Sequence, residues 1–474
     1  MFALTLYPLT LGKEWREACR EGRVFWLAIT LFVLMLAVIA SGWQSHKALS
    51  LQQQQVTESE RLRWLQQGDK GPHSAAHYGV YVIKPSSPLA VLEPGLTPYL
   101  GHTILLEAHK QNDAQFRPIQ DAVPGQRFGE LTPGFVVQIL LPLLIILFGF
   151  QSLAGERDKG TLQQLWLAGA SPCTLFWSKA AALLSLGLLF LAPLIVYVLL
   201  IAPAMSHHLT PFDWARAGII ALGYFVYLFI WVLLTLFISA VSNTSRLALL
   251  SLLIIWGALC LLIPKIAIEW STQSVQLDSA RLFQSRMESE IYTQKRLSAI
   301  EQYKQETLRQ YQVKEVSELP FDWSGAQLQF GEAYGNQVFD RLYGERQQAI
   351  NQQSSRYEWA GLLSPMVTLQ RITTAAAATD MRHHQWFSEA AERHRRHMQV
   401  LLNGDVKQNA QSADGDYKAG IALWKQVPEF NYALPDFLPL IPFYRKPLLL
   451  LCLWLVLGLI AGQWAVKHLS REQI

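Results

Sequence analysis

Histidine is the residue type in this sequence whose spacing comes nearest to that of a metal site. His394 and His397 lie three residues apart in a segment predicted to be helical, so both imidazoles share one face and form a pair of candidate ligands. Arg393, Arg395 and Arg396 crowd the same turn and would repel a cation, and no carboxylate is spaced to complete the shell. The sequence therefore favours a solvated surface pair, and we predict no metal site.

No other set of side chains forms a catalytic constellation. Ser/His/Asp, Cys/His and paired-carboxylate arrangements do not fall in a plausible site. A phosphate-binding G-x-x-x-x-G-K-[ST] loop is missing, since the nearest candidate, Gly155–Thr161, has its Lys before the second Gly. The net charge of +4 and the lack of a basic patch interleaved with aromatic residues give no indication of nucleic-acid binding. We expect no catalytic residues and no cofactor in this chain.

The most informative stretch is GERDKGTLQQLWLAGASP, Gly155–Pro172. It opens with a charged cluster, Glu156–Lys159, and continues with an apolar ridge at helical spacing: Thr161, Leu162, Leu165 and Trp166. Gly169 is predicted to end this helix, and Ser171-Pro172 is a helix start signal. A short amphipathic helix can seat in a groove of a soluble partner or lie among lipid headgroups, and periodicity alone does not choose between the two.

Six long apolar segments are predicted to span a membrane. The stretch 155–172 connects two of them, so it would lie at the membrane surface. Only 16% of the residues are charged, against about 25% in soluble chains. A membrane span needs about 20 apolar residues, because the hydrocarbon layer is about 30 Å thick and a helix rises about 1.5 Å per residue. The predicted spans are residues 24–43, 134–154, 175–203, 213–241, 247–268 and 448–466. The fold class is therefore an all-α integral membrane protein with six transmembrane helices.

The distribution of Lys and Arg in the short connections predicts the orientation. The basic residues at one side are Lys13, Arg16, Arg20, Arg23, Arg157, Lys159, Arg246, Lys467 and Arg471. The connection 204–212 on the other side has none, whereas Lys265, Arg445 and Lys446 run against the trend. By the positive-inside rule, both termini, the loop 155–174 and the tail 467–474 face the cytoplasm.

Two large segments, 44–133 and 269–447, then lie outside the cytoplasm. In the first, Leu51–Trp64 is predicted to continue the first span as a helix, and Tyr81–Ile83 is strand-like. In the second, the predicted helical blocks are Leu277–Tyr311, Glu332–Gln353 and Pro365–Leu402, followed by an extended, proline-rich stretch at 428–447. The four cysteines lie in the spans or at the cytoplasmic edge, so we expect no disulfides in the two large segments. Together the two segments predict one mostly helical extracytoplasmic domain.

The stretch 155–172 resembles the signature of ABC-2-type permeases, ER-x-x-GTL-x-x-L after the second span. The matching positions are Glu156, Arg157, Gly160, Thr161, Leu162 and Leu165. In that family the stretch forms the coupling helix that docks on the ATPase, a role that the resemblance implies here for these residues and Trp166. Residues 1–23 resemble the family's amphipathic elbow helix through Lys13, Glu14, Arg16 and Arg20. The segments 127–133 and 363–365 resemble a bacterial branch with a large periplasmic domain.

The resemblance implies a permease subunit of an ABC transporter in the bacterial inner membrane. It implies a separate ATPase subunit that binds ATP and Mg, a second permease chain in a homo- or heterodimer, and export as the direction. Two other hypotheses stay open at this point. One is a complex that transmits ATP-driven motion to a periplasmic partner, and the other is a membrane sensor or scaffold without an ATPase. The apolar spans favour an amphiphilic cargo but do not identify it.

Overall fold

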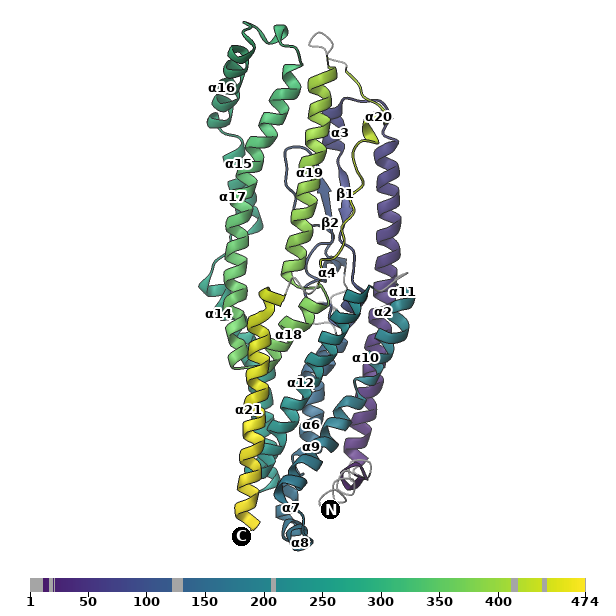
Figure 1. Ribbon diagram of the computed structural model, residues 1–474, viewed down its shortest axis with the longest axis vertical. Helices are drawn as coiled ribbons and strands as arrows, with labels where there is room; N and C mark the ends of the chain where they lie inside the picture. Colours follow the sequence, from purple (N-terminus) through teal and green to yellow (C-terminus); the bar gives the residue numbers. More distant parts are fainter. Residues whose placement is uncertain are drawn as a thin grey trace.

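Six helices of the described chain are long and apolar enough to cross a membrane. The computed structural model describes residues 12–16, 20, 22–121, 131–205, 210–410, 417–436 and 441–473. The candidate spans among them are Phe25–Leu65, Pro133–Asp158, Pro172–Leu189, Pro211–Val241, Ser245–Ser274 and Ile441–Glu472. These helices fill the lower half of Figure 1, and a second set of elements stands above them. The predicted all-α membrane fold with an additional helical domain is confirmed.

The candidate spans contain the following α-helices. They are α2 (Gly22–Leu65), α5 (Pro133–Phe135), α6 (Leu141–Gly149), α7 (Ala154–Asp158), α9 (Pro172–Leu189), α12 (Pro211–Val241), α13 (Ser245–Trp256), α14 (Ile263–Ser274) and α21 (Ile441–Gln473). The start of α2 and the end of α21 lie at the same end of the molecule as α7 and α8 (Thr161–Leu167) (Figure 1).

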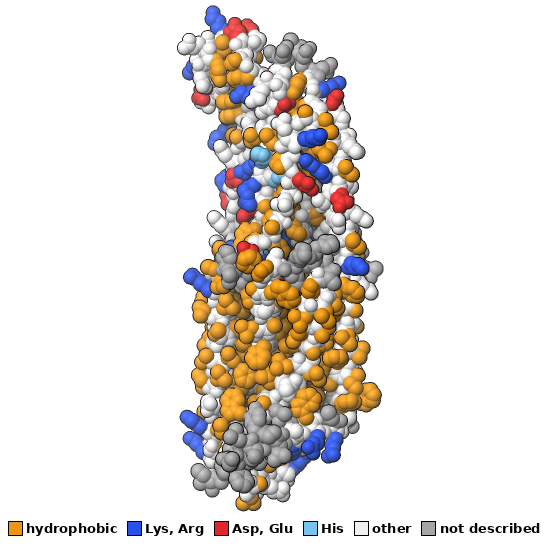
Figure 2. Space-filling view, turned by 45° about the vertical axis from the view of Figure 1, so that its right-hand side comes forward, with side chains coloured by type: hydrophobic (Ala, Val, Ile, Leu, Met, Phe, Trp, Pro, Cys, Tyr) orange, Lys and Arg blue, Asp and Glu red, His pale blue; other side chains and the backbone are white. Residues whose placement is uncertain are grey.

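The surface changes character along the long axis of the molecule. Figure 2 shows a broad band of hydrophobic side chains over the lower half, with Lys and Arg below it and mixed charges above. Apolar side chains on four different spans are more than half exposed: Val33, Leu222, Leu250 and Ile460. Such a band is unfavourable in water, whereas lipid acyl chains cover it without cost. The band therefore marks the part of the molecule embedded in the bilayer.

Helix α2 extends far beyond the hydrocarbon layer. Its 44 residues span about 66 Å at 1.5 Å per residue, roughly twice the thickness of the layer. The polar half, predicted as a helix over Leu51–Trp64, continues α2 without a break. One rigid rod thus connects the membrane with the elements above it.

The third predicted span, 175–203, is not one continuous helix, so that prediction is wrong in detail. α9 ends at Leu189, and a turn at Phe190–Leu191 separates it from α10 (Ala192–Val196). Pro193 lacks a backbone N–H and its ring clashes with the preceding turn, which breaks the helix here. A π-helical segment, Tyr197–Ile201, and α11 (Ala202–Met205) complete the span.

Two further π-helical segments lie in the second and fifth spans, Val136–Leu140 and Gly257–Leu262. A wider turn leaves carbonyl groups without their usual helical partners, and in lipid these need other donors. The Tyr227 hydroxyl donates to the Gln138 carbonyl over 2.6 Å, and the Ser364 hydroxyl donates to the Leu259 carbonyl over 2.6 Å. Neighbouring helices thus satisfy the irregular backbone.

The elements above the membrane form what we call the large domain, built from residues 44–121 and 275–436. Its elements are the outer part of α2, α3 (Pro72–Tyr78), β1 (Val80–Ile83), β2 (Thr103–Leu106), α4 (Pro118–Asp121), α15 (Ala280–Ile291), α16 (Gln294–Tyr311), α17 (Trp323–Trp359), α18 (Pro365–Ala376), α19 (Met381–Asn409) and α20 (Ile421–Trp424). β1 and β2 pair antiparallel, with Val80 opposite Leu106.

Predicted helix boundaries in this domain and in the last span need correction. The block 332–353 is the middle of the longer α17. The block 277–311 is two helices, because Thr293 caps α16 and interrupts the run. The block 365–402 is also two, because Ala378 adopts a left-handed conformation (φ 61°) and Asp380 caps α19. The last helix, α21, begins at Ile441 and not at 448, so Pro447 lies inside it.

The two sequence segments of the large domain share one core. Trp64 of α2 and Trp424 of α20 are buried and pack edge to face, with 5.8 Å between their ring centroids. The Trp64 indole donates to the Trp424 carbonyl, and the Trp424 indole donates to the Gly68 carbonyl, each over 3.0 Å. Phe387 and Met398 of α19 belong to the same cluster. The large domain is thus a single packed unit made from both segments.

Buried polar groups fix the large domain to the outer ends of the spans. The Glu93 carboxylate accepts hydrogen bonds from Gln138 of the second span, over 2.5 Å, and from Tyr224 of the fourth, over 2.6 Å. Burial raises the pKa of Glu93 to about 7, although these hydrogen bonds oppose the shift. The Asp380 carboxylate lies 2.5 Å from His383 Nδ1 and accepts from the Tyr444 hydroxyl of α21 over 2.5 Å. Both carboxylates connect the domain to membrane helices.

Candidate functional site

The stretch 155–172 folds into two short helices at the end of the molecule opposite the large domain. α7 ends at Asp158, and Gly160 turns the chain into α8 with a left-handed conformation (φ 70°) that favours glycine. Gly169 (φ 84°) follows the end of α8, and the Ser171 hydroxyl caps α9 by accepting from the Thr174 amide. The predicted stop at Gly169 and start at Ser171-Pro172 are confirmed.

A buried hydroxyl holds the chain where α6 gives way to α7. The Ser239 hydroxyl of α12 accepts from the backbone amides of Leu153 and Ala154, over 3.0 and 3.1 Å. It also donates to the Phe150 carbonyl over 2.9 Å. Three backbone groups left over at this break are thereby satisfied. The α7–α8 unit consequently has a fixed attachment to α12.

Glu156 is the centre of the polar contacts within the unit. Its side chain is buried, with 8% of the residue exposed. Oε1 accepts from Lys13 Nζ over 2.5 Å and lies 3.7 Å from Lys179 Nζ. Oε2 accepts from the Thr161 hydroxyl at the start of α8. Glu156 thus connects the N-terminal helix, α8 and α9.

Lys179 completes this cluster from the third span. It is 1% exposed and donates to the Glu14 carboxylate. A buried ammonium is costly unless it is paired, and here two carboxylates, Glu14 and Glu156, neutralise it. Lys13 and Glu14 of the predicted elbow helix therefore contact this cluster, whereas Arg16 and Arg20 are exposed.

Arg157 and Asp158 connect the unit to the remaining spans. The Arg157 guanidinium donates to the Ser242 carbonyl over 2.7 Å, to the Ala240 carbonyl over 2.8 Å and to the Glu472 carboxylate over 2.8 Å. Asp158 accepts from the amide and the hydroxyl of Ser245, the first residue of α13. Contacts from α9, α12, α13 and α21 thus converge on α7 and α8.

The apolar ridge of α8 faces the protein. Leu162 is 4% exposed, and Leu165 and Trp166 pack against the main membrane core. Leu167 is instead 89% exposed, at the tip of the unit, next to exposed Gln163 and Gln164. The predicted residues therefore anchor the helix, and a residue outside the predicted set forms its exposed face. The signal in the sequence was that Leu167 is apolar but off the ridge.

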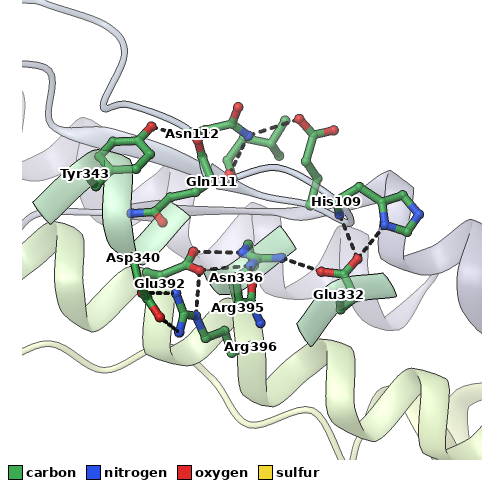
Figure 3. Close-up of polar contacts among 12 residues, drawn as sticks. His109, Gln111, Asn112, Glu332, Asn336, Asp340, Tyr343, Glu392, Arg395 and Arg396 are labelled. Atoms are coloured by element: carbon green, nitrogen blue, oxygen red, sulfur yellow. Dashed lines mark hydrogen bonds and ion pairs between the residues drawn. The ribbon is translucent and has the colours of Figure 1, made fainter. Parts of the chain in front are cut away.

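His394 and His397, the two candidate ligands on α19, lie in different environments. The His394 ring packs against Phe430, with 5.4 Å between centroids, whereas His397 is exposed. Arg395 and Arg396 both bind the nearby Glu392 (Figure 3). Three other histidines that the sequence analysis did not single out, His73, His77 and His109, lie together in the large domain.

These observations define a polytopic membrane protein whose spans meet at a small helical unit on one face. Comparison with protein families agrees: the model of the "ABC-2 family transporter protein" matches residues 10–284, more than half of the chain. The chain belongs to this family and is a permease component of an ABC transporter. Residues 281–433 match a "domain of unknown function (DUF3526)", which covers α15–α20 of the large domain. Searches of curated proteins and of solved structures gave no match.

Proposed function

We propose that this chain is the membrane subunit of an ATP-driven exporter in a bacterial inner membrane. A separate ATPase binds ATP and Mg, and a second permease chain completes the complex as a homo- or heterodimer. The α7–α8 unit and both termini face the cytoplasm, and the large domain faces the periplasm. Family membership and the distribution of Lys and Arg support this arrangement.

The geometry of the α7–α8 unit is the observation that carries the proposal. The unit is held by side chains from several spans, yet it presents Leu167 almost fully to solvent. A rigid mount with one exposed apolar side chain suits docking, because little ordering is needed when a partner binds. We assign Leu167, with Gln163 and Gln164, to the ATPase contact. Glu156, Arg157, Gly160, Thr161, Leu162, Leu165 and Trp166 position it.

Co-purification tests this proposal with a matched pair of variants. Leu167→Asp places a charge on the exposed tip, and Leu62→Asp places the same charge on an exposed leucine of α2 in the large domain. Neither site is buried, so both variants should fold. We expect the native chain and Leu62→Asp to retain an ATP-binding polypeptide with a phosphate-binding loop, and Leu167→Asp to lose it. Retention by all three would reject Leu167 as the contact, and absence from all three would reject the ATPase partner.

A second function, transmission of motion to a periplasmic partner, is favoured by the continuity of α2. One helix runs from the membrane into the core of the large domain, so a tilt of its lower half would move the domain. Spin labels at His397, with the native cysteines replaced, would measure the distance between two large domains. A change of this distance with ATP would support transmission. A constant distance, with moving labels in the spans, would favour a transport pathway.

A further inference from the structure

Three histidine side chains meet on the surface of the large domain. One ring nitrogen from each of His73, His77 and His109 lies within 4.8 Å of the other two. The ring centroids are 4.7 Å apart for His73 and His77, and 5.2 Å apart for the other two pairs. His73 Nε2 lies 3.2 Å from His77 Nε2. Two ligands of a tetrahedral zinc ion, each about 2.0–2.1 Å from the metal, would be about 3.3 Å apart.

The backbone brings the three rings together from distant positions. His73 and His77 are four residues apart on α3, so their side chains share one face. His109 follows β2, and the loop is fixed beside α3 by a hydrogen bond of 3.0 Å from the Ala108 amide to the Ala76 carbonyl. His109 itself adopts a left-handed conformation (φ 62°), which is uncommon for a residue with a side chain. The fold maintains this conformation and thereby aims the ring.

The buried Glu332 carboxylate fixes the orientation of the His109 ring. Glu332 Oε1 accepts the His109 backbone amide over 2.8 Å and lies 2.7 Å from His109 Nδ1 (Figure 3). Glu332 Oε2 accepts from Arg395 over 3.0 Å, and both side chains are almost fully buried. With Nδ1 turned to the carboxylate, Nε2 of His109 is the nitrogen left for an ion. Metal-bound histidines are commonly oriented by a carboxylate in this way.

The charges around the cluster suit a cation. Burial opposes ionisation of Glu332, but the contacts with His109 and Arg395 outweigh it and lower the pKa of Glu332 to about 2. The Glu332 carboxylate lies beside this cluster, whereas arginines flank His394 and His397 in the sequence.

We propose that His73, His77 and His109 bind a late first-row divalent cation, Zn²⁺ in the first instance. Three imidazoles without a thiolate suit Zn²⁺, and the exposed His77 leaves a fourth position open to water. Glu332 is a positioning residue for His109. Because α3 and His109 belong to the first segment and Glu332 to α17 of the second, a bound ion would strengthen the contact between the two. This site is independent of the proposed transport function.

The test measures Zn²⁺ binding to the full chain, purified in detergent with an affinity tag that contains no histidine. After removal of metals, competition with a chromogenic chelator gives stoichiometry and affinity, and Co²⁺ absorption reports coordination number. We compare the native chain with His73→Ala, His109→Ala and Glu332→Gln. The matched control is His394→Ala/His397→Ala, which removes two histidines from the same domain. His73 is near the surface, so its variant should fold.

We expect one Zn²⁺ per native chain and per control chain, with a four-coordinate Co²⁺ spectrum. His73→Ala and His109→Ala should weaken binding by at least about 100-fold, and Glu332→Gln by about 10- to 100-fold. Equal binding by the native chain and His73→Ala would overturn the proposal, as would a native chain that binds no Zn²⁺. Loss of binding in the control alone would move the site to α19 and also overturn it.

Discussion

Glu93 offers the sharpest test of how the large domain is joined to the membrane helices. Its carboxylate is 5% exposed and accepts hydrogen bonds from Gln138 and Tyr224, which belong to two different spans. Burial penalises the charged form and raises the pKa to about 7 from 4.5. Glu93→Gln keeps an oxygen that accepts both hydrogen bonds and removes the charge.

The sign of the effect follows from the proton balance. Since the folded-state pKa lies above the unfolded value, Glu93 binds more protons in the folded protein. Its contribution to stability is complete below about pH 4.5 and is lost as the pH rises through 7. At 1.36 kcal/mol per pH unit, the loss between pH 5 and pH 8 is about 2.5 kcal/mol. With an unfolding entropy of about 2.1 cal/mol/K per residue, a chain of 474 residues that unfolds as one unit would lose about 2–3 °C in Tm.

The assay is the Tm of the detergent-solubilised chain at pH 5, 6, 7 and 8, for the native protein and Glu93→Gln. We expect the variant to gain about 2–3 °C on the native chain between pH 5 and 8. Glu58→Gln, on the exposed face of α2, is the control and should leave the profile unchanged. Parallel profiles for the native chain and Glu93→Gln would refute the reasoning. A variant that loses Tm relative to the native chain as the pH rises would show that the anion is stabilised at this junction.

Three further predictions concern named side chains. Gly160→Ala should lower the free energy of unfolding by about 1 kcal/mol, because Gly160 has a φ of 70°. Gly404→Ala, within α19, should leave the stability unchanged or raise it, and equal changes in Tm for the two variants would contradict this prediction. Lys179→Met leaves two carboxylates without their buried cation and should lower the free energy of unfolding by about 3–5 kcal/mol. Lys467→Met, at an exposed position, should change it little, and the Tm of each variant measures the difference. Trp64→Ala should lower the free energy of unfolding by about 3–5 kcal/mol and make the large domain susceptible to limited proteolysis. Unchanged resistance to the protease would contradict the place of Trp64 in the core.

Long apolar windows and capping signals were readable from the sequence because they act locally. Six runs of about 20 apolar residues have no other stable environment than lipid. Gly169 and Ser171-Pro172 fix the end of one helix and the start of the next through backbone conformation and one side-chain hydrogen bond. The continuation of α2 beyond the membrane was also predictable, since its polar half contains no glycine or proline up to Leu65.

Features that depend on contacts between distant residues were not predictable in this way. The division of the third span depends on how Phe190–Leu191 packs as well as on Pro193. Periodicity identified the apolar ridge of α8 but not its direction, which is set by Lys13, Lys179 and Arg157.

The histidine cluster shows the same limit most clearly. His73 and His109 are separated by a hairpin, and Glu332 comes from a segment more than 200 residues away. Only the fold brings them together. The sequence instead drew attention to His394 and His397, which are close along the chain but have no clustered partners among the described residues.

Site-specific cross-linking at the tip of α8 tests the central claim most directly. A photo-reactive amino acid at position 167 would be compared with the same group at position 62, an exposed leucine position of the large domain. We predict that irradiation of intact cells joins the chain to a polypeptide with a phosphate-binding loop from position 167 and not from position 62. An adduct with that polypeptide from position 62 alone, or none from either position, would contradict the account.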